Sequence, residues 1–411
     1  MGGAGSRAVE KKRVTVELLY DWLRILLRWG HVIAAIMWIG DSLLFMWIDS
    51  HLSKDPQSRT DVAGMTWLIH GGGYYQLEKR WLVPGHLPPK LRWFWLEATS
   101  TWISGFLLLI LIYYANAGAF MVGGASRLTS AQAIAVGLGM LLGGWLLYDG
   151  LWRSALARRP LLALAISSAV LVGAIYAALH LLSARAAAMH VGAMLATIMA
   201  ANVWVHILPP QWRMVQAARE GREIDYALGA HAKVRSTHNT YLTFPVIFLM
   251  LTPHFPAIYS GPLDWVVLSL FVGLGAGIRH VMLVGVRAAG WVTAATAAAA
   301  AVLLYLTAQP GSTPRAAAVP ALAQAPPFVK VRTILVSRCA VCHSETPSMI
   351  GVTSAPNDVK MDTPQQIKAL APLIKTVAVD RSTMPPDNKT HITPEERALL
   401  GRWVDAGAPL K

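Results

Sequence analysis

The hydrophobic positions of this chain gather in long apolar stretches instead of the short periodic runs of a soluble protein. A stretch of about 20 apolar residues is the length that an α-helix needs to cross the hydrocarbon core of a bilayer. Eight such stretches occur, at residues 22–48, 93–115, 131–151, 161–182, 189–208, 240–258, 264–284 and 289–308. The pattern predicts an all-α fold in which residues 1–308 form an eight-helix transmembrane bundle.

The C-terminal part of the chain has a different pattern. Residues 309–327 are rich in Ala and Pro, which is typical of an extended linker. Residues 328–411 begin with a predicted short helix over 328–338. Thr393 and the residues after it supply an N-cap, a proline and two acids for a final helix that ends near Asp405. The sequence therefore predicts a membrane domain, a linker and a small helical domain.

Composition and charge support a membrane location for the first domain. The chain is 55% hydrophobic and 14% charged and contains 16 Trp, which for 411 residues indicates a membrane protein more than a large soluble core. Lys and Arg cluster in the first, third and fifth predicted loops, whereas the second holds only Arg127, the fourth only Arg185 and the sixth none. Because cytoplasmic loops carry the basic excess, both termini are predicted to face outward. The net charge of +14 follows from these loops and does not indicate nucleic-acid binding.

This orientation predicts a multi-pass protein of the bacterial inner membrane with its C-terminal domain in the periplasm. Lys11, Lys12 and Arg13 oppose it, because they place positive charge on the outward N-terminus. An amphipathic N-terminal segment on the membrane surface would reconcile the two observations, and so would a different helix count. We expect no cleavable signal peptide, because the first apolar stretch is long and has no small-residue cleavage site.

The sequence CAVCH at residues 339–343 contains both cysteines of the chain, Cys339 and Cys342. A C-x-x-C-H motif is typical of covalent haem c, in which the two thiols bind the porphyrin and the adjacent His343 binds iron. The alternatives are a redox dithiol and half of a zinc site, but the chain has no second cysteine pair and no thioredoxin-like strand pattern. The motif predicts a class I cytochrome c domain, and hence electron transfer.

A sixth iron ligand is predicted at Met384, which lies in the sequence Arg-Ser-Thr-Met-Pro-Pro. Methionine is a usual partner of histidine in c-type cytochromes, and the prolines stiffen the loop that would present it. Met361 and Met349 are the alternatives for this role. The predicted metal ligands are thus His343 and Met384.

Histidines in the predicted spans fall into two layers, because neighbouring spans run in opposite directions. The periplasmic layer contains His31, His190 and His254, and the cytoplasmic layer contains His206, His238 and His280. Facing imidazoles in a helical bundle can hold b-type haem, so the periplasmic layer predicts ligands for one or two b haems. The alternative is that these are buried or interfacial histidines with structural hydrogen bonds.

Charged residues inside the predicted spans also share one side. Asp41, Glu97, Asp149 and Arg279 all map to the cytoplasmic halves of their spans. Charges at membrane depth need partners or a water-filled cavity, so a polar pocket that opens to the cytoplasm is predicted. Structural ion pairs are the alternative.

Three stretches carry a resemblance to a known family. Residues 70–105, 189–211 and 233–256 resemble the membrane-bound, cytochrome c-fused urate oxidases, the PuuD-type urate hydroxylases, and the resemblance covers nearly the whole chain. A second similarity is the pattern of His31, Trp38 and Gly40, which resembles the haem-binding first helix of the copper-resistance D and membrane protoporphyrinogen oxidase group. This second similarity supports His31 as a haem ligand.

The first resemblance implies that urate is oxidised to 5-hydroxyisourate, with electrons passed to the chain's own haem c and not to oxygen, so that no hydrogen peroxide forms. The implied acceptor beyond the chain is a soluble cytochrome c or a terminal oxidase. The implied substrate-binding residues are Lys79, Arg235, Asn239 and Arg279. The implied catalytic residues are Glu97 or His206 as base and His238 as a polarising group.

Two other functions remain open on the sequence alone. A respiratory electron conduit would oxidise quinol and be indifferent to urate. A transport or copper-handling protein with a cytochrome sensor would lack b haem, and the scarcity of Cys and of dense Met clusters in the spans argues against copper.

Overall fold

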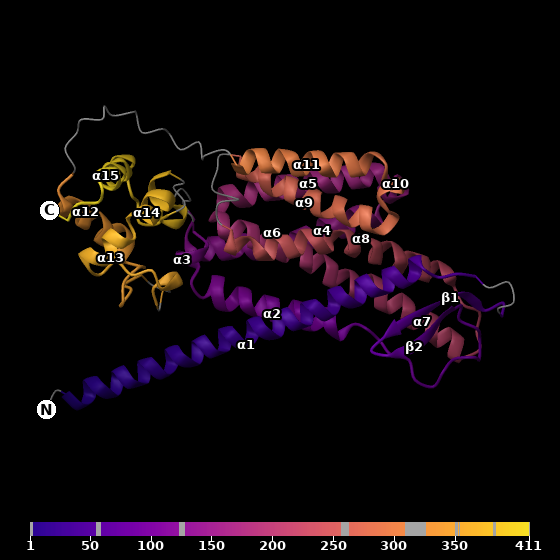
Figure 1. The fold of residues 1–411 in the computed structure, drawn as a ribbon. Helices are drawn as coiled ribbons and strands as arrows, with labels where there is room; N and C mark the ends of the chain where they lie inside the picture. Colours follow the sequence, from indigo (N-terminus) through magenta and orange to yellow (C-terminus); the bar gives the residue numbers. More distant parts are fainter. Residues whose placement is uncertain are drawn as a thin grey trace.

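A computed structural model describes residues 3–54, 59–122, 128–255, 263–308, 326–349, 352, 354–380 and 384–410. Long helices lie side by side in a bundle, and a small helical module lies at one end of it (Figure 1). A two-stranded hairpin lies at the other end of the bundle.

The described part of the bundle contains helices at all eight predicted spans and three further helices that the apolar stretches did not predict. The helices are α1 (Gly3–Ser50), α2 (Leu96–Leu108), α3 (Ala117–Phe120), α4 (Ser130–Arg153), α5 (Pro160–Leu181), α6 (Ala184–Ala201), α7 (Leu208–Arg219), α8 (Tyr226–Leu251), α9 (Asp264–Val284), α10 (Val286–Ala289) and α11 (Trp291–Ala308). The three further helices are α3, α7 and α10. Two π-helical segments interrupt the series, η1 (Leu109–Tyr114) after α2 and η3 (Asn202–Ile207) after α6, and short 3-10 turns occur at η2 (Ala155–Arg158) and η4 (Thr252–His254).

Six helical segments in the described part of the chain are long and apolar enough to cross a membrane. They are Leu18–Ser50, Leu96–Tyr114, Ser130–Arg153, Pro160–Leu181, Ala184–Arg219 and Asp264–Val284. The sixth and eighth predicted spans are also helical, as α8 and α11, but α8 has a polar first half and α11 is shorter. The predicted span 240–258 begins too late, because α8 begins at Tyr226, and its last residues, 256–258, lie outside the described residues.

Helix α6 lies at the centre of the bundle and packs against α2, α4, α5 and α8. Small residues make this possible, since a helix with Ala and Gly on several faces lets neighbouring backbones approach closely. At Gly137 of α4, an added Cβ atom would lie 2.6 Å from Nε2 of His190. At Gly144, it would lie 2.4 Å from Cγ of Met194. The α4–α6 interface therefore requires glycine at these two positions.

The prediction of a wholly helical protein is wrong for the first loop, which forms a β-hairpin. Strand β1 (Val62–His70) pairs antiparallel with β2 (Gly73–Arg80). Gly71 and Gly72 have φ of 57° and 79°, values that a tight hairpin turn needs and that glycine adopts without strain. The aromatic and β-branched residues on either side of the turn favour strands. Glycines that interrupt helix thus form the turn of a hairpin.

The C-terminal module is a separate small helical unit with its own apolar core. It contains α12 (Phe328–Leu335), α13 (Pro364–Ala369), α14 (Ala371–Ile374) and α15 (Pro394–Asp405), with short π or 3-10 segments at η6 (Val336–Ala340), η7 (Pro356–Asp358), η8 (Lys375–Asp380) and η9 (Pro386–Asn388). Trp403 is fully buried, and its ring lies beside that of Phe328. The predicted final helix is confirmed, with Thr393 as N-cap in a capping box with Glu396.

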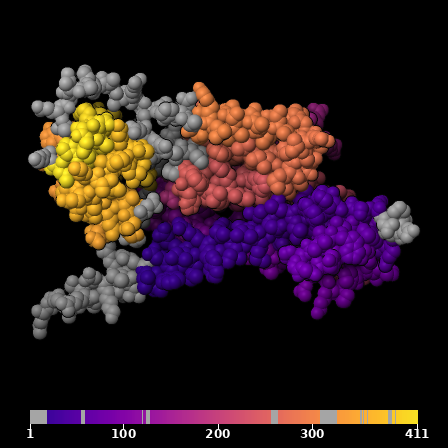
Figure 2. Space-filling model, in the orientation of Figure 1, coloured from indigo at the N-terminus to yellow at the C-terminus, as the bar shows by residue number. Residues whose placement is uncertain are grey.

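The module and the bundle touch at one end of the molecule (Figure 2). The ammonium of Lys389 lies 5.3 Å from the ring centroid of Phe120 in α3. Ser183, which precedes α6, donates a hydrogen bond of 2.7 Å to the carbonyl of Phe120. The module therefore sits at the end of the bundle where α6 begins, opposite the hairpin.

The close approach at Gly137 generates a test of the α4–α6 interface. In Gly137→Val the new side chain meets His190 in a packed interior, and overpacking of this kind costs about 1–3 kcal/mol. We expect a lower thermal unfolding temperature for the detergent-solubilised protein. Gly139→Val is the matched control, because an added Cβ there meets no atom within 4 Å. Equal unfolding temperatures for the two variants would contradict this account of the interface.

Candidate functional site

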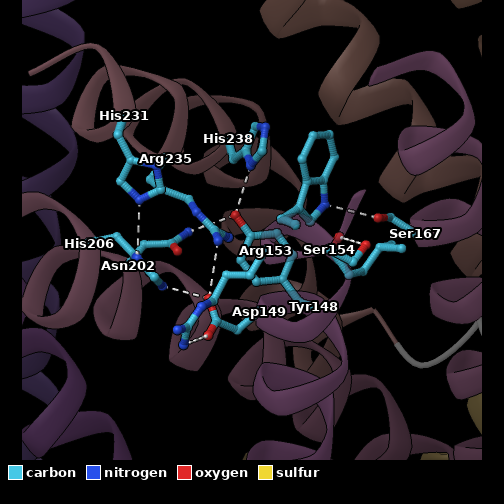
Figure 3. A network of polar contacts seen from close by, with 12 residues as sticks. Tyr148, Asp149, Arg153, Ser154, Ser167, Asn202, His206, His231, Arg235 and His238 are labelled. Carbon is cyan, nitrogen blue, oxygen red and sulfur yellow. Dashed lines mark hydrogen bonds and ion pairs between the residues drawn. The ribbon is translucent and has the colours of Figure 1, made fainter. Parts of the chain in front are cut away.

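A buried cluster of polar side chains lies at the hairpin end of the bundle, where α4 ends and η3 and α8 pass (Figure 3). Asp149 is at its centre and is 7% exposed. Its carboxylate accepts a hydrogen bond of 2.5 Å from His206 Nε2 and one of 3.1 Å from Arg235 Nη2. Arg153 reaches the other oxygen at 3.5 Å, but its side chain is 66% exposed. The strong interactions are therefore those with His206 and Arg235.

The local backbone explains why His206 and Asn202 both point into the cluster. Pro209 and Pro210 follow η3 and have no backbone N–H, so they cannot continue the α-helical hydrogen bonds of α6. The chain widens into a π-helical segment before them, and Asn202 and His206 are both buried there. Segments of this kind occur frequently at functional sites.

A chain of hydrogen bonds fixes the orientation of the polar groups around Tyr148. Asn239 donates through Nδ2 to the carbonyl of Met199 at 2.9 Å, so its Oδ1 is free to accept from Asn202 Nδ2, also at 2.9 Å. Asn202 Nδ2 also donates to the Tyr148 hydroxyl at 3.0 Å. The Tyr148 proton then goes to Nδ1 of His238, 2.8 Å away. Neutral His238 consequently carries its own proton on Nε2 and can donate it.

A second chain runs from the buried carboxylate toward the surface. His206 donates through Nε2 to Asp149, and its Nδ1 lies 3.3 Å from Nε2 of His231. Both nitrogens of His206 are thus occupied. His231 is exposed at the start of α8. This arrangement suits the transfer of protons between the cluster and the surface better than direct contact of His206 with a substrate.

Some polar atoms in the buried site have no partner among the described residues. Arg235 is 1% exposed and its Nη1 makes no hydrogen bond. Asn202 is fully buried and its Oδ1 has no donor. Buried groups of this kind are nearly always satisfied in native proteins, so a bound molecule or water is expected at these two atoms.

Three other predicted site residues form no hydrogen bond or ion pair with this cluster in the described part of the chain. Lys79, on β2, pairs with Asp49 at the end of α1, and Lys233 pairs with the other oxygen of the same carboxylate. Glu97 lies in the first turn of α2 with Oε2 buried and without a partner in the described structure. Arg279 of α9 is 4% exposed and likewise has unpartnered nitrogens. The roles predicted for Lys79, Glu97 and Arg279 remain predictions.

The predicted periplasmic histidine layer is spread out. His31 places Nδ1 3.0 Å from both the carbonyl of Thr101 and Oγ of Ser104. His190 is fully buried, with Nε2 3.3 Å from the hydroxyl of Tyr114. Ten residues of helix separate Ser104 from Tyr114, a rise of about 15 Å.

His254 lies in η4 and is exposed. The structure therefore does not gather His31, His190 and His254 around one position. His31 could bind a haem iron through Nε2, which makes no hydrogen bond to a described residue. His190 fits less well, because Gly137 packs directly against its Nε2.

In the C-terminal module, the geometry of the CAVCH sequence fits covalent haem c. Cys339 and Cys342 are free thiols. His343 has Nδ1 3.1 Å from the carbonyl of Val359, which leaves Nε2 for iron. Burial raises the pKa of the Cys339 thiol to about 11 and also raises that of Cys342.

Met384 is held in place by its backbone. Its N–H donates to the carbonyl of Val377 at 2.9 Å, and its carbonyl accepts from Nη1 of Arg397 at 2.7 Å. The side chains of Met384 and Cys339 are both partly buried and pack against the module's core. Of the two alternatives, Met361 is buried in that core, and Met349 has its sulfur 3.2 Å from that of Cys342.

Tyr148, Asn202 and His231 belong to the cluster but were missed from the sequence. Tyr148 immediately precedes Asp149, and Asn202 precedes His206 by four residues, which is one helical turn. His231 lies outside the predicted span 240–258. A search for polar residues next to, or one turn from, the charged and polar residues of the predicted spans would have found the first two.

Comparison with known families gives a match to the bundle. The family model described as Urate oxidase N-terminal matches residues 17–309, most of the chain. No curated protein and no solved structure matches the chain. The matched residues include those of the buried cluster, whereas the C-terminal module lies outside them.

Removal of the central charge tests the cluster. Asp149→Asn leaves Arg235 buried without an anion, and the loss of one member of a buried ion pair costs about 3–5 kcal/mol. We expect the thermal unfolding temperature of the solubilised protein to fall. Asp49→Asn is the control, because Asp49 also joins two cations but is 29% exposed, where ion pairs contribute little. An equal loss in both variants would show that burial of the cluster is not what makes it stabilising.

The C-terminal module gives a prediction for acidic pH. Burial alone would raise the pKa of Glu396, but hydrogen bonds from the Arg338 guanidinium outweigh it and hold the pKa below its usual value. A carboxylate with a depressed pKa stabilises the folded state above its unfolded pKa, and this contribution is lost as the pH falls through the folded pKa.

Glu396→Gln should therefore weaken the module at neutral pH and reduce its further loss of stability in acid. Hydrogen exchange of residues 394–405 in the full-length protein, compared between variants at each pH, measures this effect. Glu345→Gln, at an exposed carboxylate of the same module, is the control. An acid profile of Glu396→Gln identical to that of the wild type would exclude the role of the pair.

Proposed function

The chain belongs to the urate oxidase N-terminal family, and from this premise we propose that it is a membrane-bound urate oxidase. The family match over residues 17–309 is the observation that carries the proposal. The reaction proposed is the oxidation of urate to 5-hydroxyisourate. Electrons would pass to a haem c on the same chain and then to a soluble cytochrome c or a terminal oxidase, without hydrogen peroxide.

The buried cluster is the proposed substrate site. Urate is a flat anion with several carbonyl oxygens, and a buried guanidinium with a free N–H suits such a ligand. Arg235 Nη1 would bind a urate oxygen, and Nε2–H of His238 would polarise a second one. Asn239 would act by holding Asn202 in place, because both polar atoms of its side chain are already bonded.

The overall reaction adds the oxygen of one water molecule to urate and releases two electrons and two protons. The protons need a path out of a buried site. The chain from Asp149 through His206 to the exposed His231 supplies one, because each imidazole can accept a proton on one nitrogen and release one from the other.

The electrons would leave by the opposite end of the molecule. A haem c held by Cys339, Cys342 and His343, with Met384 as sixth ligand, would accept them one at a time. From His206 to the start of α6 the helix rises by about 30 Å, so an intermediate carrier is required between the site and the module. We propose one or two b haems for this role, with His31 as a ligand.

The proposed location is the bacterial inner membrane. The hairpin end of the bundle, which carries the basic loops, would face the cytoplasm. The C-terminal module would then lie in the periplasm, where covalent haem attachment takes place. The lipid bilayer would cover the apolar side chains that α1 exposes, such as Leu19, Trp29 and Ile36.

Anaerobic addition of urate to the detergent-purified protein tests the proposed function. We expect the reduced α-band of haem c to develop at a catalytically useful rate, with no peroxide when oxygen is admitted. Arg235→Lys should abolish this reduction, because Lys cannot form both guanidinium contacts. Arg153→Lys, at the exposed arginine on the same carboxylate, should retain it. Reduction by dithionite or quinol but not by urate would support an electron conduit instead.

A further inference from the structure

Of the two unpartnered atoms of the buried cluster, one is a hydrogen-bond acceptor and the other is a hydrogen-bond donor. Within the described part of the chain, Asn202 Oδ1 is an acceptor without a donor, and Arg235 Nη1 is a donor without an acceptor. Both side chains are almost completely inaccessible to solvent. To leave a buried donor or acceptor unsatisfied costs about 1–3 kcal/mol each, so a bound molecule or a water is expected to pair with each atom.

The orientation of the Asn202 amide is settled by its neighbours. The carbonyl of Met199 can only accept, so Asn239 must turn Nδ2 toward it and Oδ1 toward Asn202. Asn202 must then present Nδ2 to Asn239, and its two N–H groups are used by Asn239 and Tyr148. Oδ1 of Asn202 is left facing away from both.

Asn202 and Arg235 converge on the same side chain. Asn202 bonds to the hydroxyl of Tyr148, and the guanidinium of Arg235 lies 5.1 Å from the centroid of the Tyr148 ring. Figure 3 shows the two side chains reaching Tyr148 from η3 and from α8. The two unpartnered atoms therefore belong to side chains that meet at Tyr148, and a ligand that reached both atoms would find an acceptor and a donor.

We propose that Asn202 and Arg235 together recognise a lactam edge, in which a ring N–H stands next to a carbonyl oxygen. Asn202 Oδ1 accepts from the ring N–H, and Arg235 Nη1 donates to the carbonyl oxygen. This assigns Asn202 as a specificity-determining residue, and it rests on the proposed function because urate is the lactam-bearing purine proposed as substrate. A single-ring carboxylate or a simple inorganic anion offers oxygens to Arg235 but no N–H to Asn202.

The assignment makes the site sensitive to which ring nitrogen carries hydrogen. A methyl group on the nitrogen that faces Asn202 removes the donor and adds bulk against a buried amide. Sites built to bond a polar group discriminate strongly against analogues that lack it, because their own buried groups are then left unpaired. Methylation of a ring nitrogen that faces elsewhere has no such effect.

The test uses urate and the monomethyl urates, each with its methyl group on a different ring nitrogen, as electron donors to the full-length holoprotein. We expect the wild type to discriminate against one isomer more than the others. In Asn202→Ala, kcat/KM for that isomer relative to urate should rise by about tenfold or more, because the acceptor and the steric block are both gone. The ratios for the other isomers should stay unchanged.

Asn116→Ala is the matched control, because Asn116 also donates to a tyrosine hydroxyl, that of Tyr20, and lies near the opposite end of the bundle. Its isomer profile should equal that of the wild type. A wild type without isomer preference, or an Asn202→Ala variant that weakens all substrates equally, would overturn the proposal and leave Asn202 with a structural role around a bound water. Absence of any reduction by urate in the wild type would instead refute the proposed function itself.

Discussion

The carboxylate of Asp149 is the group on which the arrangement of the candidate site depends. It is the anionic partner of Arg235, a fully buried cation in a bundle whose interior is largely apolar. A charge in such surroundings is tolerated only with a partner and further hydrogen bonds, so Asp149, Arg235 and His206 must be buried together. The position of His206 in turn sets that of His231, and Arg235 extends over Tyr148.

The bundle places this cluster far from the C-terminal module. Helix α6 and its π-helical continuation connect the two ends, and small residues on α6 let its neighbours pack tightly around it. One end offers a buried cation and directed hydrogen bonds, which suit the binding of a polar anion. The other end meets a module with cysteine, histidine and methionine in positions that suit a redox group. Their separation is the physical reason why an additional carrier enters the proposed function.

Several elements could be predicted from the sequence because their determinants are local. The final helix of the C-terminal module follows from Thr393, Pro394 and Glu396, which cap and start a helix wherever they occur. The apolar stretches give helices because a membrane-length run of such residues has few other stable forms. The CAVCH sequence points to its chemistry through spacing alone. The hairpin was missed because the same glycines that interrupt a helix can form a turn.

Within the site, the sequence by itself placed Asp149 and His206 in membrane spans and pointed to Arg235, His238 and Asn239 as site residues, although all three precede the predicted span 240–258. Only the tertiary structure decided that these five come together, that Tyr148 and Asn202 link them, and that Lys79 pairs with Asp49 instead. It also separated His31 from His190, which a count of residues along each span had placed in one layer. The physical reason is twofold. The rotation and depth of each helix are set by packing against its neighbours, as where Gly137 contacts His190. The direction of each hydrogen bond is set by partners distant in sequence, as where Asn239 donates to the carbonyl of Met199.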